Sequence, residues 1–165
     1  MKTPTILILA NVVVVLGWIN FSIFSQERIL ETGRPVFVKL APADPRSLMQ
    51  GDYMTLRYSL FAGSVLSITS KVPTRGFAVM KLDDRGVGEI VRFDGVTDEQ
   101  LLAEDEVLIR YRKTRRGFRV APQSYFFQEG RAEEFEKARF AEFRVSAGGE
   151  AVIAKLLDEE LKPFN

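Results

Sequence analysis

The sequence predicts a mainly β protein, in which one N-terminal transmembrane helix precedes one antiparallel domain, barrel-like or a sandwich, with one or two short helices. Three observations lead to this prediction. No charged residue occurs from residue 3 to residue 26, which is typical of a membrane span. After this span, short alternating apolar runs recur between clusters of Gly, Pro and Asp, as in an antiparallel sheet. The chain has no cysteine, so its domain must be stabilised by a core rather than by disulfides.

The first 24 residues form the predicted anchor. About 20 apolar residues cross a bilayer, and Trp18 would lie near one interface. A cleaved signal peptide is the alternative, but Ser22 and Ser25 are poorly spaced for a cleavage site and have bulky neighbours. The Lys and Arg counts of the two flanks do not decide the orientation, whereas the short tail with Lys2 is typical of a signal-anchor. We expect a single-pass anchor in the inner (cytoplasmic) membrane, with the C-terminal domain outside the cytoplasm.

Residues 25–34 are predicted to be a juxtamembrane tether, about 30 Å long if extended. Residues 35–165 form the predicted domain, which is long enough to bury a core. The 23 basic and 22 acidic residues nearly balance, whereas a nucleic-acid binder normally has a large basic excess. We therefore expect no nucleic-acid partner.

The elements of the domain follow from alternation and from turn residues. Strands are predicted at 35–40, 53–61, 76–82, 87–93, 106–112, 117–121, 139–146 and 150–157. Three hairpin turns, each with the glycine that a tight turn needs, are predicted at 83–86, 114–117 and 147–149. A helix is predicted at 131–138, where Ala132, Phe135 and Ala138 recur at helical spacing. A weaker helical turn is predicted at 98–103.

The stretch from residue 44 to residue 58 has the most specific pattern in the chain. Asp44-Pro45 and Gly51-Asp52 are turn dipeptides, because proline fixes φ, glycine permits positive φ, and aspartate bonds nearby backbone amides. From residue 53 the pattern alternates as in a half-buried strand. One face of this strand carries Met54, Leu56, Tyr58 and Leu60. We expect the polar residues of the corner to cap and brace the turns.

Residues 51–58 resemble the signature of the GDYXXLXY family, and the similarity extends over residues 25–157. It includes the Pro-x-Asp-Pro-Arg-Ser-Leu approach to the signature and a later Glu-Gly pair. The resemblance implies a bacterial protein with a membrane anchor, a small extracytoplasmic domain and no established activity. Such proteins are often encoded beside multi-pass membrane proteins, which implies an accessory subunit. The candidate motif residues are Asp44, Arg46, Ser47, Gly51, Asp52, Tyr53, Leu56, Tyr58 and Glu129.

The residue types that the chain lacks exclude several chemistries. Without histidine or cysteine there is no Ser-His-Asp triad, no cysteine nucleophile and no ordinary zinc site, and we expect no metal and no cofactor. Residues 48–52 also resemble part of the type I signal peptidase element, but Ala43 stands where its nucleophilic serine would be. The alternative function is a hydrolase or small-molecule binder built on the 44–58 corner. The sequence selects no catalytic carboxylate pair, since Asp44, Asp52 and Glu129 could be close together or distant.

Basic residues crowd the hairpin predicted around residue 115. They are Arg110, Arg112, Lys113, Arg115, Arg116 and Arg119. This hairpin could clamp anionic lipid headgroups or an acidic loop of a partner, with about 1 kcal/mol per charge near an anionic surface. The alternative is a solvated hairpin, partly neutralised by the acidic residues 104–106 and by the glutamates of the 131–138 helix.

Tyr125, Phe126 and Phe127 form an aromatic run. Alternation would expose either Phe126 or its two neighbours and leave an apolar patch suited to a partner or to the membrane surface. Core packing is the alternative. The residues that we expect to contact a partner or lipid are Arg112, Arg115, Arg116, Tyr125 and Phe127. These observations favour a non-enzymatic binding domain whose partner is an integral membrane protein.

Overall fold

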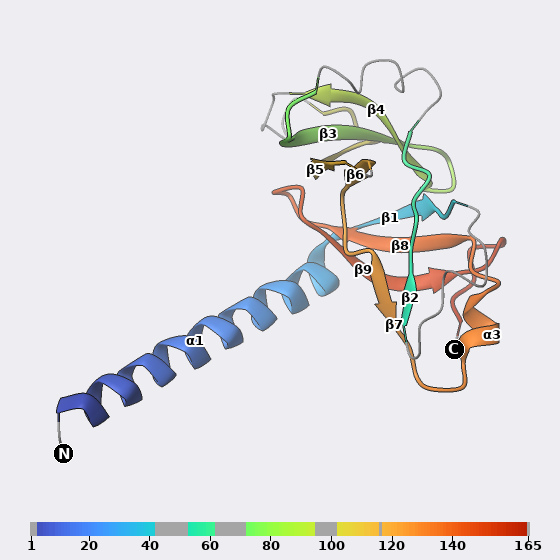
Figure 1. The fold of residues 1–165 in the computed structure, drawn as a ribbon. Helices are drawn as coiled ribbons and strands as arrows, with labels where there is room; N and C mark the ends of the chain where they lie inside the picture. Colours follow the sequence, from blue (N-terminus) through green and yellow to red (C-terminus); the bar gives the residue numbers. More distant parts are fainter. Residues whose placement is uncertain (1–2, 42–52, 62–71, 95–101, 116, 165) are drawn as a thin grey trace.

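One long helix and three small antiparallel sheets make up the protein (Figure 1). The computed structural model describes residues 3–41, 53–61, 72–94, 102–115 and 117–164. Figure 1 shows the helix projecting away from a strand-rich body that curls like half of a barrel. The predicted mainly β class is therefore confirmed.

Helix α1 (Thr3–Thr32) contains a segment, Ile6–Thr32, that is long and apolar enough to cross a membrane. The extended tether expected at residues 25–34 is not observed, because the helix continues to Thr32. The physical reason lies in the sequence: residues 26–32 contain good helix formers and neither glycine nor proline. Ile29 also becomes buried, with 6% of its surface exposed, so tertiary packing stabilises this last turn.

The strands form a three-stranded, a four-stranded and a two-stranded sheet, all antiparallel. The three-stranded sheet has the order β1 (Arg34–Lys39), β8 (Phe140–Val145), β9 (Ala151–Leu157). The four-stranded sheet has the order β4 (Gly88–Asp94), β3 (Arg75–Leu82), β5 (Glu106–Thr114), β6 (Gly117–Arg119). The third sheet pairs β2 (Tyr53–Thr55) with β7 (Ser124–Phe126). A short helix, α3 (Ala132–Phe135), follows β7.

The core lies between the sheets. Its largest fully buried side chains are Phe143, Leu56, Met80, Ile90, Ile109, Leu156, Val36, Val38 and Val79. An aromatic cluster closes one end of this core, where the Phe93 ring lies 5.1 Å from both Tyr111 and Phe118. Side chains from all three sheets thus share one apolar interior.

The three predicted hairpin turns are confirmed, and in each of them a glycine has positive φ. The φ angles are 78° at Gly86, 121° at Gly117 and 76° at Gly149, a region that L side chains rarely adopt. The positions of most predicted strands are confirmed within a few residues. The sequence therefore located the hairpins through the one residue type that their backbone requires.

Three elements differ from the predictions. The strand expected at 53–61 is regular only to Thr55, because the later backbone groups bond in turn to Gln123 before β7, to Lys39 of β1 and to Ile90 of β4. Strand β7 was not predicted, and α3 is shorter than the predicted helix at 131–138. Most of the turn predicted at 98–103 lies outside the described residues.

Candidate functional site

Residues 55–61, here called the signature segment, connect the sheets and form one wall of the candidate site. Ala41 N–H donates to the Arg57 carbonyl at 2.8 Å, and Ser59 N–H donates to the Lys39 carbonyl at 2.8 Å. At the far end, Ile90 N–H donates to the Leu60 carbonyl at 2.6 Å. The segment is therefore fixed to β1 and to β4 by its own backbone.

Several side chains of the signature segment point into the protein, among them Leu56, Tyr58 and Leu60. Leu56 is buried, with 2% of its surface exposed. The Tyr58 ring packs edge-on against Phe143 at 5.1 Å, and its hydroxyl donates to the Pro122 carbonyl at 2.5 Å. Burial raises the pKa of Tyr58 well above its usual range, so the phenol stays neutral and keeps its proton for this bond. Thr55 and Arg57 alternate to the exposed side.

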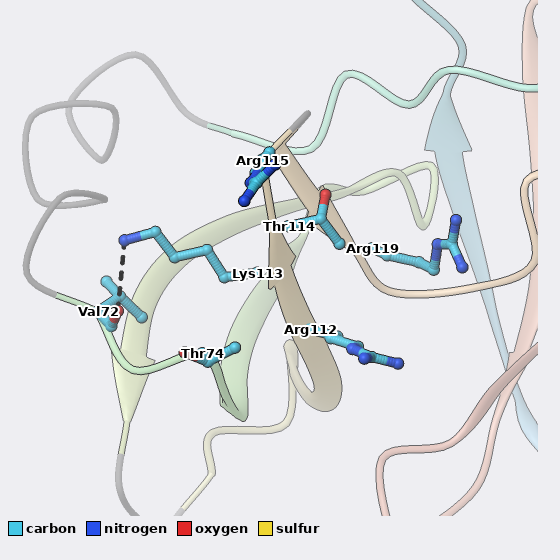
Figure 2. Close-up of a pocket in the computed structure, with 7 residues that line it drawn as sticks. All are labelled: Val72, Thr74, Arg112, Lys113, Thr114, Arg115 and Arg119. Atoms are coloured by element: carbon cyan, nitrogen blue, oxygen red, sulfur yellow. Dashed lines mark hydrogen bonds between the residues drawn. The ribbon is translucent and has the colours of Figure 1, made fainter.

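A groove of about 810 Å³ lies between the signature segment and the β5–β6 hairpin. Thr55, Arg57 and Tyr58 contribute to one wall, and Arg115 and Arg119 contribute to the other. A second, more open hollow of about 710 Å³ adjoins it on the hairpin and shares Thr114, Arg115 and Arg119 (Figure 2). The fold thus brings together two sets of residues that the sequence analysis had treated separately.

The described lining residues of the groove and the hollow include no acidic side chain. Their charged members are Arg57, Arg112, Lys113, Arg115 and Arg119. Lys113 is partly satisfied, since its Nζ donates to the Val72 carbonyl at 3.4 Å (Figure 2). Among the described residues, the guanidinium groups of Arg57, Arg112, Arg115 and Arg119 form no ion pair. We call these four side chains the basic rim.

Among the described side chains, the expected neutralisation of the hairpin by residues 104–106 and by the glutamates of the 131–138 segment is not observed. Asp105 pairs with Lys81 at 3.4 Å, Glu106 pairs with Arg92, and Glu134 pairs with Arg131 at 2.7 Å. Of the hairpin arginines, Arg110 pairs with Glu150, at 2.8 Å. The strand registers bring Glu106 of β5 near Arg92 of β4, whereas Glu134 pairs locally with Arg131 in the region of α3. Within the part of the chain that the structure describes, the basic rim therefore has no carboxylate partner.

A family model with the description GDYXXLXY protein matches residues 15–156. The chain belongs to the GDYXXLXY family. Neither the curated proteins nor the solved structures gave a match to it. Within this GDYXXLXY protein, the second half of the signature supplies Leu56 to the core and Tyr58 to both the core and the groove.

Several predicted site residues of the GDYXXLXY protein cannot be placed at the groove. Asp44, Arg46, Ser47, Gly51, Asp52 and Arg116 lie outside the described residues, as does the Tyr53 side chain, although its backbone belongs to β2. Glu129 is exposed in the turn after β7 and is not among the groove residues. The described residues contain no cluster of three or more metal-binding side chains.

In the aromatic run of residues 125–127, the two side chains that were predicted to contact a partner are turned towards the protein. Tyr125 and Phe127 pack against Phe135, with ring centroids 5.6 Å and 5.2 Å apart, so these two predicted contact residues are half-buried. The exposed ring is Phe126, with 74% of its surface accessible. Alternation had left both orientations open, and the position of Phe135 settles the choice.

Sequence reasoning also missed Arg57 as a groove residue. The signal was present, because Arg57 lies between Leu56 and Tyr58 in the alternating pattern and was predicted on the exposed face. The sequence did not show that the β5–β6 hairpin lies opposite that face. Guanidinium groups bind carboxylates and phosphates through paired hydrogen bonds, so the groove has the chemistry of an anion-binding site.

Proposed function

We propose that this protein is a membrane-anchored binding domain that acts outside the cytoplasm as an accessory subunit of an integral membrane protein. One observation carries the proposal: the apolar helix enters the sheet without a flexible connection. Helix α1 ends at Thr32 and β1 begins at Arg34. A domain mounted in this way meets other membrane proteins at a raised effective concentration and in a restricted orientation.

The junction between helix and sheet is packed and hydrogen-bonded. Gly33 N–H donates to the Ile29 carbonyl at 2.9 Å, and the Arg144 guanidinium of β8 donates to the Gly33 carbonyl at 3.4 Å. Gly33 is itself buried, and a Cβ atom there would lie 2.5 Å from the Ile29 carbonyl oxygen. This packing supports a fixed direction of the domain relative to the helix, which lowers the ordering cost of binding a neighbour in the same membrane.

The proposed location rests on the sequence of the N-terminal region and on the family resemblance. The lack of a good cleavage site after the apolar span favours a retained signal-anchor in the cytoplasmic membrane. The basic rim supplies the proposed contact surface, because exposed arginines that have no carboxylate partner among the described residues are suited to an acidic surface on the neighbour.

Site-specific photocrosslinking in native membranes tests the proposal. A photoreactive residue at Arg115, on the groove, is compared with one at Glu159, an exposed residue of the C-terminal turn. We expect Arg115 to capture an integral membrane protein, and Glu159 to capture it more weakly or not at all. Capture of soluble proteins only, or equal capture at both positions, would contradict the proposal. A flexible insertion after Gly33 should lower the yield at Arg115.

A further inference from the structure

Three arginines stand in one row across the four-stranded sheet. Arg75 of β3 is the register partner of Arg112 of β5, and Arg112 is in turn the partner of Arg119 of β6. Residues directly opposite one another in an antiparallel sheet project from the same face, and like charges at such positions destabilise the pairing. The row therefore opposes the folding of the sheet that carries it.

Within the described residues, Arg119 Nε donates a hydrogen bond to Gln123 Oε1 at 3.1 Å, but this neutral amide brings no negative charge to offset the repulsion. Arg75, Arg112 and Arg119 are all exposed, and none of them forms an ion pair with a described residue. Arg110, two residues before Arg112, differs from them because it pairs with Glu150 and lies over the Phe77 ring at 5.6 Å. Figure 2 shows Arg112 and Arg119 extending to the same side of the hairpin, with Lys113 on the opposite side.

The shape of the site indicates the kind of anion. Neighbouring strands lie about 4.8 Å apart, so the row is about 10 Å long. This length exceeds a single phosphate and is enough for two carboxylates, about 7 Å apart on an extended chain, to lie along the row. Small molecules generally bind in enclosed pockets, whereas this face is open. The adjoining groove runs beside β6, which is an edge strand of its sheet and has room for an extended segment.

We infer that the row formed by Arg75, Arg112 and Arg119 binds an extended acidic segment of the membrane partner. The inference rests on the proposed function and deepens it, because it assigns the recognition chemistry to named side chains. Arg119 belongs to the row and also lines the groove, so it would direct the segment from one to the other. Arg57 and Arg115 would hold the part of the segment that lies in the groove.

The test uses the full chain in nanodiscs of neutral phosphatidylcholine. The probe is a fluorescent peptide of alternating Glu and Ser, and its control is the same peptide with Gln in place of Glu. We expect the acidic peptide to bind with an affinity that falls as salt rises, and Arg112→Gln/Arg119→Gln to weaken binding by about tenfold. The charge-matched variant Arg85→Gln/Lys155→Gln, on exposed residues outside the row, should stay within about twofold of the parent.

Several results would overturn the inference. One is equal affinity for the acidic and neutral peptides, and another is equal loss in the two double variants. A third is binding of pyrophosphate as tight as that of the peptide, which would indicate a small anion. A fourth is failure of the peptide to bind while Arg112→Gln/Arg119→Gln reduces the anionic lipid that co-purifies with the chain, which would indicate a lipid headgroup.

Photocrosslinking at Arg115 separates this inference from the proposed function. If Arg112→Gln/Arg119→Gln lowers the yield of the membrane-protein adduct, the row is supported as the recognition site. If the adduct persists at full yield, the inference about the row fails and the accessory function stands. If the parent chain gives no adduct, the accessory function fails, and the peptide measurement still decides whether the row binds acidic chains.

Discussion

At the scale of single residues, Tyr58 shows how one side chain of the family signature serves the fold and the groove together. Its ring contacts Phe143 in the core, and its hydroxyl closes the segment against the Pro122 carbonyl. The same residue lines the groove. The second tyrosine of the signature is thus explained by packing and by one hydrogen bond, without assigning it a chemical step.

Substitution of Tyr58 separates these two contributions. Tyr58→Phe removes only the hydroxyl and should lower the free energy of unfolding by about 1 kcal/mol. Tyr58→Ala also removes the ring and should cost about 3 to 5 kcal/mol. Urea unfolding of the full chain in micelles would measure both values. Equal losses would mean that the hydrogen bond, rather than the ring, is the main contribution.

Most substitutions lower the stability of a protein, but we expect that removing one charge from the arginine row raises it. Arg112→Thr removes the charge between two others and places a good strand former in the sheet, so the free energy of unfolding should rise by about 0.2 to 1 kcal/mol. The increase should shrink at high salt, because salt screens the repulsion. A lower stability than that of the parent, measured by thermal unfolding at low salt, would show that the arginines stabilise the sheet.

At the scale of elements, an ion pair joins β4 to β5 across the intervening β3. Glu106 of β5 accepts two hydrogen bonds from the Arg92 guanidinium of β4, and a third comes from Ala103 N–H at 3.2 Å. Hydrogen bonding from Arg92 is the main reason that the pKa of Glu106 lies below its usual value. Because the folded protein lowers this pKa, the charged form stabilises the fold.

The pH dependence of Glu106→Gln follows from this shift. The contribution of Glu106 is fully present above its unfolded pKa of about 4.3 and is lost as the pH falls through its lower folded value. Glu106→Gln should therefore lower the free energy of unfolding by about 1 kcal/mol or less at neutral pH, since Arg92 is partly exposed. The difference should vanish at a pH low enough to protonate Glu106 in both the folded and the unfolded parent protein. Unfolding of both proteins across this pH range would measure the difference. A constant difference at all pH values would contradict the assignment.

The junction between α1 and the three-stranded sheet makes a second prediction at this scale. Gly33→Ala would place a Cβ atom 2.5 Å from the Ile29 carbonyl oxygen and 3.1 Å from Val145 N, and both of these neighbours are backbone atoms. We expect a loss of about 1 to 3 kcal/mol and faster proteolysis near residue 33. Gly17→Ala is the matched control, because nothing lies within 4 Å of its Cβ position. Equal behaviour of the two variants would show that the junction is not tightly packed.

At the scale of the whole molecule, the class, the apolar helix and the hairpins were predictable, because each depends on a local signal. Glycine at residues 86, 117 and 149 marks turns whose backbone only glycine adopts easily. The partners of Glu106 and the inward direction of Tyr125 were not predictable, because they depend on registers between distant segments. The groove joins residues 55–61 to residues 114–123 and has no local signature at all.

The orientation in the membrane can be tested directly because the chain contains no cysteine. A single cysteine introduced as Glu159→Cys should react with a membrane-impermeant maleimide in intact spheroplasts. Lys2→Cys, in the short tail, should react only after lysis. Labelling of Lys2→Cys but not Glu159→Cys before lysis would place the domain in the cytoplasm and contradict the proposed location.

The uninterrupted α1 helix also makes the height of the groove depend on the lipid. The uncharged stretch of α1, residues 3–26, is about 36 Å long, whereas a bilayer interior is about 30 Å thick. The excess must be taken up by tilting or must extend above the headgroups. Since the helix passes into β1 without a hinge, tilting of α1 would turn the arginine row with it. Bilayer thickness would thereby set which depth of a neighbouring protein the row can reach.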